Sequence, residues 1–405
     1  MIDVFARNES NVRSYCRDFP AVFTRAEGHH LWDENGRQYV DLLCGAGALN
    51  YGHNPPAMVS RVVEYLTSGG PVQSLDLHTA AKAMFLHRFR EVILEPRGMG
   101  SYVVQFPGPA GTLAVEAALK LARKVTGRTG VVAFRGGFHG ASLGSLAATT
   151  SPLLRGAAGT PLRDVTFLPY DELPVLDPLR DPPAAILLET VQGEGGLAAA
   201  SGAWLARVRR LADETGALLI IDDIQAGCGR TGTFFSFEPF GVLPDLVCLS
   251  KSLSGMGLPM AAVLIRRDLD QWAPGEHNGT FRGHNLAFVA ATVALELWSD
   301  PAFTVHVSRL ALAVRAALRE MAGGLPGGTA DVVGRGAMSG LRFTDPALTA
   351  RVRDELYGEG VIAETAGGGH VLKLLPPLTM PLDEWGSVAR LVNAVVSHTA
   401  VPAPS

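Results

Sequence analysis

Three apolar stretches of this sequence each end in an ionisable side chain, and together these side chains could transfer protons or attack a carbonyl carbon. The stretches AAILLE, ALLIID and DLVCLSK end at Glu189, Asp222 and Lys251. Apolar runs of this length between turns are typical of strands buried on both faces. In open α/β sheets the ligand site lies beyond the carboxyl ends of the strands. The pattern favours a site that combines carboxylates with an amine, although three unrelated strand ends would look the same.

A short loop rich in glycine and proline offers a second chemical feature. PGPAGT, at 107–112, precedes a helical pattern, so its backbone N–H groups and the positive end of the helix dipole would face an anion such as phosphate. Turns of this composition are common before helices, so the loop alone is a weak signal. The G-x-x-x-x-G-K-[ST] pattern of nucleoside triphosphatases is absent, which disfavours that class.

Lys251 is unusual because it follows an apolar strand, in the stretch LSKSL. Burial would lower its pKa and suit it to Schiff-base chemistry, although a single lysine at a strand end more often extends to solvent. Pyridoxal phosphate needs a lysine for its aldehyde, a cradle for its phosphate and a carboxylate that keeps its ring nitrogen protonated. We therefore expect this cofactor, with Asp222 at the ring nitrogen. Asp223, on the opposite face of the strand, is expected to be structural.

The elements that would position these groups form an α/β domain. From about residue 55 to 300, short apolar runs alternate with helical patterns, which indicates a mostly parallel sheet with helices on both faces. Helices are expected at 113–125 and 203–215, the second ending at Gly216. Strands are expected at 101–106, 131–134, 184–189, 217–222 and 245–251.

The two ends of the chain predict a smaller α+β domain. HHLWDENGRQYVDLL, at 29–43, indicates two short strands around the turn Asn35-Gly36. Beyond residue 300 follow a long helix, the break GGLPGG, the strand-like stretches GLRF and HVLKLL, and a final helix from about 382. We predict an N-terminal segment of the small domain at 1–54, a large cofactor-binding domain at 55–300 and the C-terminal part of the small domain at 301–405.

Composition excludes several classes of function. The net charge of −4 gives no reason to expect nucleic acid or an anionic membrane as a partner. The four cysteines are scattered without a C-x-x-C pair, so no metal site is expected and the thiols fit a reducing compartment. The start MIDVFARNES lacks the apolar core of a secretory signal, and no apolar run reaches the roughly 18 residues of a membrane helix. We expect a soluble, cytoplasmic protein that acts on small molecules.

Longer motifs resemble one protein family. LLIIDDIQAGCGRTGTFFSFEPFG, PDLVCLSKSLSG, FPGPAGTLAVEAALKLARKVTGR, ETVQGEGG and GEHNGTFRGHN are similar to motifs of the class III, fold type I, pyridoxal-phosphate aminotransferases, and the resemblance runs from about residue 10 to the end. Within the class, VRSYCRDFPAVFTRA, GAGALNYGHNPP and LHTAAK most resemble the L-2,4-diaminobutyrate:2-oxoglutarate aminotransferases of the ectoine-pathway type.

The resemblance implies a role for each matching residue. Lys251 would bind the cofactor aldehyde and move the proton during transamination, and Asp222 would contact the ring nitrogen. Because the phosphate site would be shared between subunits, the smallest active unit would be a homodimer. The remaining contacts would be Gln225 at the ring hydroxyl, Phe138 and Ile224 on the two ring faces, and Gly111, Thr112 and the neighbouring subunit's Thr280 at the phosphate.

Departures from the family pattern bear on the substrate. Ornithine and 4-aminobutyrate aminotransferases usually have carboxylate-gripping arginines where this chain has Ala141 and Lys373, and the diaminobutyrate group shares the change. A Glu194–Lys373 pair that opens and closes would admit glutamate and a diamine in turn, a permanent ion pair being the alternative. Arg13 and Arg17 are candidate carboxylate contacts, unless both are merely solvated.

Three further residues differ from the family pattern or adjoin its motifs. Leu113 stands where the class often has a polar residue, and His284 where asparagine is expected. An odd histidine is more often a packing variant than a catalyst, although His284 lies near Thr280 and could retune specificity. His139 is expected to be structural.

The predicted activity is transfer of the amino group of L-glutamate to L-aspartate 4-semialdehyde, giving L-2,4-diaminobutyrate and 2-oxoglutarate reversibly. The alternatives are a related ω-aminotransferase for another diamine or a carrier-linked intermediate, or an aminomutase on the same fold. Dependence on 2-oxoglutarate distinguishes the last of these.

Overall fold

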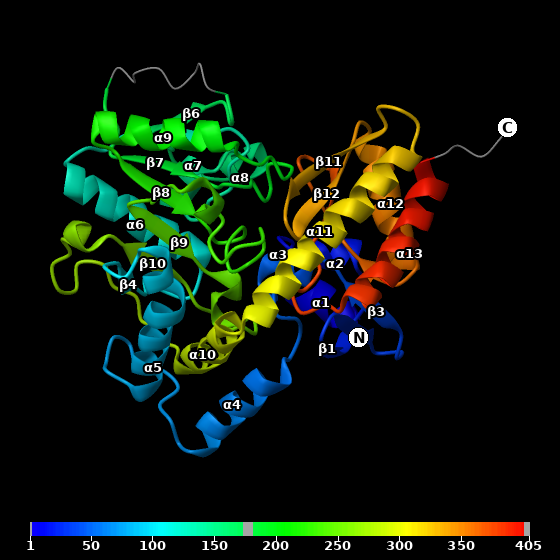
Figure 1. The fold of residues 1–405 in the computed structure, drawn as a ribbon, viewed down its shortest axis with the longest axis horizontal. Helices are drawn as coiled ribbons and strands as arrows, with labels where there is room; N and C mark the ends of the chain where they lie inside the picture. The colour runs from blue at the N-terminus through cyan, green and yellow to red at the C-terminus, as the bar shows by residue number, and fades with distance from the viewer. Residues whose placement is uncertain (1, 173–180, 401–405) are drawn as a thin grey trace.

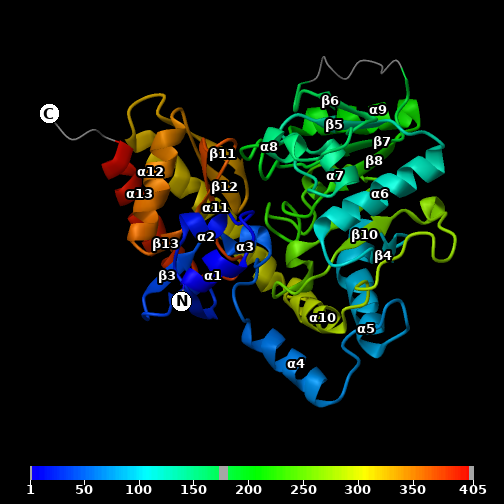
Figure 2. The ribbon, with the colours of Figure 1, turned by 180° about the vertical axis from the view of Figure 1, so that it is seen from behind.

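The computed structural model describes residues 2–172 and 181–400 as two lobes of unequal size (Figure 1). The larger lobe is built around a sheet flanked by helices, and the smaller lobe contains both the first and the last described elements of the chain. Seen from behind, the N-terminal helices α1 (Ile2–Asn8) and α2 (Tyr15–Asp18) lie against the smaller lobe (Figure 2).

A seven-stranded sheet forms the centre of the larger lobe, in the order β4-β10-β9-β8-β7-β5-β6. Every described strand runs in the same direction except β10, which is antiparallel to both of its neighbours. The predicted, mostly parallel sheet is therefore confirmed. The strands are β4 (Val103–Gln105), β5 (Val131–Phe134), β6 (Val165–Leu168), β7 (Ala185–Leu188), β8 (Leu218–Asp222), β9 (Leu246–Leu249) and β10 (Ala262–Ile265).

Helices cover both faces of this sheet because the strand side chains alternate between two apolar cores. On β8, Leu219 and Ile221 pack on the face covered by α9 (Gly202–Thr215) and α10 (Asn285–Ser299), whereas Leu218 and Ile220 pack on the face covered by α6 (Gly111–Thr126). The predicted stop of α9 is confirmed at Gly216, which has a φ of 65°. The other helices of this lobe are α4 (Pro56–Thr67), α5 (Ala80–Phe89), α7 (Leu143–Ala148) and α8 (Pro152–Gly156).

The smaller lobe joins the two ends of the chain through a shared sheet. The predicted hairpin at 29–43 is present, and its second strand pairs in parallel with a strand more than 300 residues later, so that Val40 lies opposite Val361. This sheet has the order β1-β2-β3-β13, and a second has the order β11-β12-β15-β14. The strands are β1 (Phe23–Glu27), β2 (His30–Asp33), β3 (Gln38–Asp41), β11 (Ala330–Arg335), β12 (Met338–Phe343), β13 (Val361–Ile362), β14 (Glu364–Ala366) and β15 (Val371–Leu374).

Helices of the C-terminal half cover these two sheets and bury a separate apolar core. The long helix and the final helix that the sequence predicts are present as α11 and α13. The domain limits at 54 and 300 stay a prediction. The helices of this lobe are α3 (Cys44–Gly47), α11 (Pro301–Gly324), α12 (Pro346–Gly358) and α13 (Leu382–Ala400). Shorter helical turns occur at Arg90–Leu94, Glu95–Arg97, Glu238–Phe240, Lys251–Ser254 and Arg267–Leu269.

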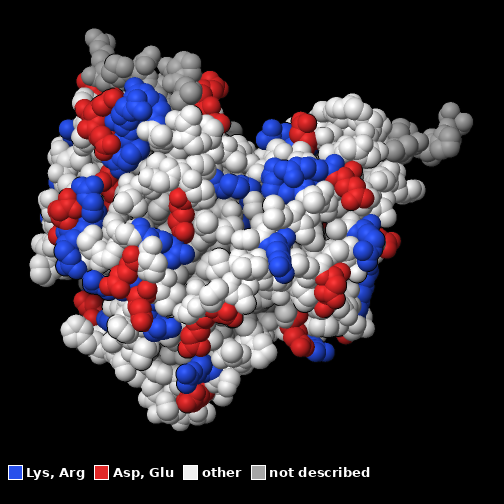
Figure 3. Space-filling model, viewed as in Figure 1, with Lys and Arg blue, Asp and Glu red and all other residues white. Residues whose placement is uncertain are grey.

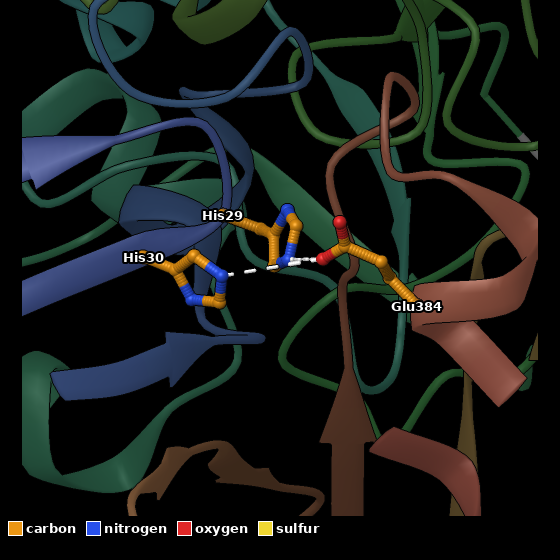
Figure 4. Close-up of side chains that lie close together, drawn as sticks. All are labelled: His29, His30 and Glu384. Carbon is orange, nitrogen blue, oxygen red and sulfur yellow. Dashed lines mark ion pairs between the residues drawn. The ribbon is translucent and has the colours of Figure 1, made fainter. Parts of the chain in front are cut away.

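A polar contact ties the N-terminal hairpin to α13. His29 and His30 turn toward Glu384 (Figure 4), and His29 Nε2 lies 2.5 Å from Glu384 Oε2. Within the described part of the chain, these three are the only group of three or more histidine, cysteine or acidic side chains whose donor atoms, within 4.8 Å of one another, could hold a metal ion.

Charge and hydropathy of the folded chain agree with its composition. Basic and acidic side chains are interspersed over the face drawn in Figure 3. Among residues 2–172 and 181–400, no single helix is long and apolar enough to cross a membrane; α10 and α11 meet such a criterion only together, across an 84° bend.

Candidate active site

A cavity of about 430 Å³ lies at the carboxyl ends of the parallel strands. Glu189 directly follows β7, Asp222 ends β8 and Lys251 follows β9 by two residues, and all three side chains line the cavity. The predicted convergence of two carboxylates and an amine is therefore present. Because β7, β8 and β9 are neighbours in the sheet, their ends deliver these groups side by side.

Lys251 reaches the cavity from a strained backbone position. It opens a short 3₁₀ helix, Lys251–Ser254, with a φ of +48°, a left-handed conformation that costs energy for a residue with a side chain. Burial lowers the pKa of its amine, and the nearby positive charge of Lys373 lowers it further. A buried amine with a lowered pKa is suited to act as a nucleophile and as a proton carrier near neutral pH.

Asp222 is held by a histidine that the sequence analysis placed in a structural role. His139 Nδ1 lies 2.7 Å from Asp222 Oδ2, both side chains are buried, and both line the cavity. The other carboxylate oxygen accepts the backbone N–H of Ile224 at 3.2 Å. These contacts fix the orientation of Asp222, so His139 belongs to the site.

Asp223 points to the other side of β8, as its position on the strand predicts. Its Oδ2 accepts the backbone N–H of Ser236 at 3.0 Å, and it does not line the cavity. Burial raises the pKa of the Asp223 carboxyl to about 7. This acid is part of the packing behind the site.

Gln225 contributes a buried amide that faces the cavity. Its Nε2 donates to Ala46 O at 2.9 Å, whereas its Oε1 is buried with no hydrogen-bond partner among the described residues. Unpartnered buried acceptors are rare, and in a cavity they point to a ligand that supplies the donor. Ala46 itself lines the cavity and has a φ of +54°, so the small residues of GAGAL leave room there.

The start of α6 closes another side of the cavity. Gly111, the first residue of the helix, packs so tightly that a Cβ atom there would lie 3.0 Å from Ile224 Cδ1. Thr112 Oγ1 lies 2.5 Å from Ser142 Oγ and 2.6 Å from Ser145 Oγ. Backbone N–H groups at a helix start and a cluster of hydroxyls form a site suited to a phosphate. The two serines were not predicted from the sequence.

Glu189 and Phe138 form the rim beside Lys251. The Phe138 ring is partly exposed at the cavity, and its backbone N–H donates to Glu189 Oε2 at 3.4 Å. Burial, followed by the charge of Asp222, raises the pKa of the Glu189 carboxyl well above its ordinary value. This shift favours the neutral form of Glu189.

The opposite wall combines residues of the smaller lobe with Glu194, from the turn after β7. Lys373 is fully buried, with its Nζ 3.2 Å from Glu194 Oε1 and 2.7 Å from Glu364 Oε1. Glu194 lines the cavity, and so does Tyr15, whose hydroxyl donates to Glu364 Oε2 at 3.3 Å. The Glu194–Lys373 pair was predicted, but Tyr15 and Glu364 were not. Ala141 also lines the cavity.

Several predicted residues lie outside this cavity. Arg13 pairs with Glu9 at 3.6 Å, and Arg17 donates to the oxygens of Asn11 at 3.0 and 3.1 Å, so both are engaged within the N-terminal segment. Thr280 is exposed, and its predicted contact with a second subunit stays a prediction.

The two unusual residues also lie away from the cavity. His284 caps α10, because its Nδ1 accepts the backbone N–H of Ala287 at 3.2 Å, and burial lowers its pKa. Leu113 is half-buried in α6, where it packs against Gly108. Neither lines the cavity, so the geometry supports the packing role for His284.

These residues together define a class of enzyme. A buried amine, a carboxylate fixed by a histidine, an unpartnered amide oxygen and a helix start with hydroxyls match the aldehyde, ring nitrogen, ring hydroxyl and phosphate of pyridoxal phosphate. When bound, this cofactor supplies an electron sink for a carbanion at the substrate carbon. The site is thus that of an enzyme acting on amino compounds through this cofactor.

Comparison with known proteins agrees with this class. Residues 13–395 match the family model for aminotransferase class-III, and the chain belongs to this family. It is 49% identical to a diaminobutyrate–2-oxoglutarate transaminase of Halalkalibacterium halodurans, over 95% of this chain and 93% of the relative. It is 50% identical to the transaminase of the same name of Vibrio cholerae, over 94% of this chain and 96% of the relative.

A solved structure shares the whole fold. The ornithine aminotransferase from Toxoplasma gondii, crystallised with partial occupancy of PLP at its active site, superposes with a TM-score of 0.87 at 25% identity. The superposition covers 98% of this chain and 94% of that structure. The predicted fold type, with both lobes, is confirmed.

Proposed function

We propose that this protein is a pyridoxal-phosphate aminotransferase that moves the amino group of L-glutamate to L-aspartate 4-semialdehyde. The products are L-2,4-diaminobutyrate and 2-oxoglutarate, and the reaction is reversible. Identity of 49–50% over nearly the whole length to two diaminobutyrate–2-oxoglutarate transaminases supports the substrate pair. The semialdehyde follows from chemistry, because replacing the 4-amino group of diaminobutyrate by a carbonyl oxygen leaves an aldehyde at C4.

The cavity residues divide the work of holding the cofactor. Asp222, oriented by His139, would hold a proton at the ring nitrogen, and the unpartnered oxygen of Gln225 would accept the ring hydroxyl. The ring contacts of Ile224 and Phe138 and the phosphate contacts of Gly111 and Thr112 complete the proposed set.

Lys251 is the proposed proton carrier. Its amine would hold the cofactor between turnovers and, when free, would carry a proton to and from the substrate carbon. Burial and the charge of Lys373 lower the pKa of this amine, which favours the unprotonated form that this step requires.

The smaller lobe supplies the proposed choice between substrates. While Glu194 is paired with Lys373, which we call the closed arrangement, the cavity accepts the ω-amino group of a substrate. When Glu194 turns aside, an N–H of Lys373 becomes available to a carboxylate of glutamate or 2-oxoglutarate. The exposure of the Glu194 side chain, 40% against 0% for Lys373, supports Glu194 as the moving partner. Arg13 and Arg17 remain candidate carboxylate contacts only if the N-terminal segment rearranges.

The proposed active unit is a homodimer. Exposed apolar side chains cluster on α4, α5 and the segments around them, a surface that a second copy would cover. In the dimer, Thr280 would reach the cofactor phosphate of the partner. Mixing two inactive variants, Lys251→Ala and a bulky Thr280→Trp, tests this, because only a shared site restores activity in the mixed dimer. The apolar side chains are Val63, Leu66, Val72, Leu75, Leu77, Met84 and Phe281.

A cytoplasmic location is the remaining proposal. All four cysteines are free, and three of them are buried, which suits a reducing compartment. Fractionation of cells that produce the tagged full-length chain tests this location.

The test of the activity uses the visible spectrum of the purified enzyme. Amino donors are added one at a time without an acceptor, and conversion of the cofactor to its amine form is followed. L-2,4-diaminobutyrate and L-glutamate should each convert it, whereas ornithine and 4-aminobutyrate should convert it much more slowly. Conversion by a different diamine but not by diaminobutyrate would keep the reaction type and reject the substrate. Turnover without any 2-oxoglutarate would favour an aminomutase.

A further inference from the structure

Glu364 is a buried carboxylate that the proposed reaction has not yet used. It lies on β14 directly opposite Lys373 on β15, so the pairing of the two strands holds the two side chains on the same face. Its side chain is 4% exposed, and its Oε1 lies 2.7 Å from Lys373 Nζ. Unlike Glu194, which comes from a turn and is 40% exposed, Glu364 is fixed within the sheet.

The cluster around Lys373 has one negative charge in excess. Two carboxylates, Glu194 and Glu364, share a single ammonium, so one plus charge meets two minus charges. Burial alone would lower the pKa of Lys373, but Glu364 and then Glu194 raise it above the ordinary value, so the ammonium is charged. Glu194 and Tyr15 both line the cavity, so the excess negative charge of the cluster lies at the cavity surface.

We propose that Glu364 is a specificity-determining residue: by neutralising Lys373, it leaves the charge of Glu194 uncompensated and makes this wall select substrates that carry a second ammonium group. The inference rests on the proposed function and deepens it, because a diamino acid has such a group and a simple ω-amino acid does not. Glu364 acts through its charge and does not touch the substrate.

The physical argument compares this cluster with a simple pair. A single carboxylate paired with a single buried ammonium has no net charge. Such a neutral wall does not offset the free energy that a cation loses when its hydration shell is removed. With Glu364 present, the wall carries one net negative charge while Glu194 is on Lys373. One unit charge at ~7 Å, at an effective dielectric constant of about 20, is enough for a tenfold or larger preference.

Two substrates isolate this effect because they differ by one group. L-2,4-diaminobutyrate and 4-aminobutyrate have the same chain, carboxylate and reacting amine, and only the first has an ammonium group at C2. The ratio of their second-order rate constants for converting the cofactor to its amine form measures the preference for that ammonium. In Glu364→Gln, which keeps the shape and removes the charge, the ratio should fall about tenfold.

Two control variants separate charge from structure. Glu364→Asp keeps the charge, and Tyr15→Phe removes the hydrogen bond to Glu364 without changing the charge of the cluster. In both, the ratio should stay within about threefold of the wild-type value, since a charge-based preference depends on the charge alone. An equal loss of both rate constants in Glu364→Gln would overturn the proposal and leave Glu364 a structural role.

A measurement without substrate checks the charge itself. The visible spectrum of the holoenzyme reports the protonation of the Lys251 nitrogen bound to the cofactor. Removing a nearby negative charge should shift this titration to lower pH in Glu364→Gln and not in Glu364→Asp. An unshifted titration in Glu364→Gln means that Glu364 is not charged in the native protein, which also overturns the proposal.

The substrate assignment and the charge effect can fail separately. If the wild-type enzyme uses a longer diamine in place of diaminobutyrate, the assignment is wrong, but the ratio is measured equally well with ornithine and 5-aminopentanoate, which differ by the same ammonium group. A tenfold fall for that pair in Glu364→Gln supports the role of Glu364, and an unchanged ratio rejects it.

Discussion

The two walls of the cavity differ in how the chain builds them. On the side of the larger lobe, Glu189, Asp222 and Lys251 follow three neighbouring strands of one sheet, so a single edge delivers them together. On the side of the smaller lobe, Tyr15 meets Glu364 across 349 residues of sequence, and Lys373 lies between two carboxylates. The first wall depends on local strand geometry, and the second depends on the joining of the two chain ends.

This difference separates chemistry from selection. The sheet edge holds the groups that any reaction with pyridoxal phosphate needs: an amine, a fixed carboxylate and an anion cradle. The opposite wall holds an ion pair between Glu194, from the turn after β7, and the buried Lys373, with the fixed carboxylate of Glu364 behind it. Changes to the first wall should abolish turnover for every substrate, whereas changes to the second should alter the order of preference among substrates.

The largest expected effect tests the first wall. Lys251→Ala should lower the rate of cofactor conversion by about 10³-fold or more for diaminobutyrate and glutamate alike, because the proton carrier is lost for both. Stopped-flow absorbance after loading with pyridoxal phosphate measures it. The midpoint of thermal unfolding should not fall, since the change removes a buried amine. A loss confined to one of the two donors would contradict the separation of the walls.

Asp222→Asn should have the next largest effect. The amide keeps the shape and the contact with His139 but loses the charge that holds a proton at the ring nitrogen, so we expect a loss of about 10²-fold for both donors. His139→Asn is the matched variant, because it keeps the charge of Asp222 and removes only its 2.7 Å contact. Its loss should be about tenfold. A larger loss for His139→Asn than for Asp222→Asn would mean that the histidine itself transfers protons.

Changes to the second wall should lower the free energy of unfolding as well as alter substrate selectivity. Lys373→Met removes the only cation of the cluster and leaves Glu364 buried beside Glu194, which should cost about 3 kcal/mol or more of the free energy of unfolding. The double variant Lys373→Met, Glu364→Gln should recover part of this loss, because it removes the buried charge. Thermal and urea unfolding of the holoenzyme measure both. A double variant less stable than Lys373→Met would show that the cluster is held by packing.

The sequence allows the first wall to be predicted because its signals are local. Each of the apolar runs that end at Glu189, Asp222 and Lys251 is recognisable by itself, and parallel strands bring their carboxyl ends to one edge. His139 was missed although it follows β5, which lies in the same sheet beside β7. The loop of His139 follows a strand whose carboxyl end lies at the same sheet edge as Glu189 and Asp222. That position could have been used to predict His139 as a site residue.

The second wall could be predicted only in part. The family motif pointed to Glu194 and Lys373, but nothing local indicates that Glu364 lies opposite Lys373, because strand register over a short turn depends on tertiary packing. Similarly, the N-terminal segment was expected to face the pocket through Arg13 and Arg17, whereas the residue between them, Tyr15, lines it. In so short a helix, which buries none of its residues, no periodicity indicates which side chain faces the cavity.

A smaller effect on KM is expected when Tyr15 and its neighbour Arg17 are compared directly. Tyr15→Phe should raise the KM for both donors by roughly threefold to tenfold, because it removes a hydroxyl from the cavity and frees one oxygen of Glu364. Arg17→Ala is the matched control from the same segment, and its KM values should change by less than about twofold, since its contacts are within the segment. Steady-state kinetics with each donor measures both. A larger effect for Arg17→Ala would restore that arginine as a carboxylate contact and imply movement of the segment.

The smallest expected effect concerns Asp223, which lies behind the first wall and should influence stability alone. Its pKa is about 7 in the native protein against an ordinary value of 3.8, because burial disfavours the charged form. As pH rises from about 4 to 7, the unfolded chain therefore releases this proton while the native protein retains it, and the stability present at low pH is lost. Asp223→Asn has no such proton to release, so its midpoint of thermal unfolding should exceed that of the wild type by about 2 °C or more at pH 8 and by much less at pH 4. Its rates with both donors should stay close to wild type, because the side chain does not line the cavity. A loss of turnover in Asp223→Asn would mean that the first wall extends through β8 to its far side.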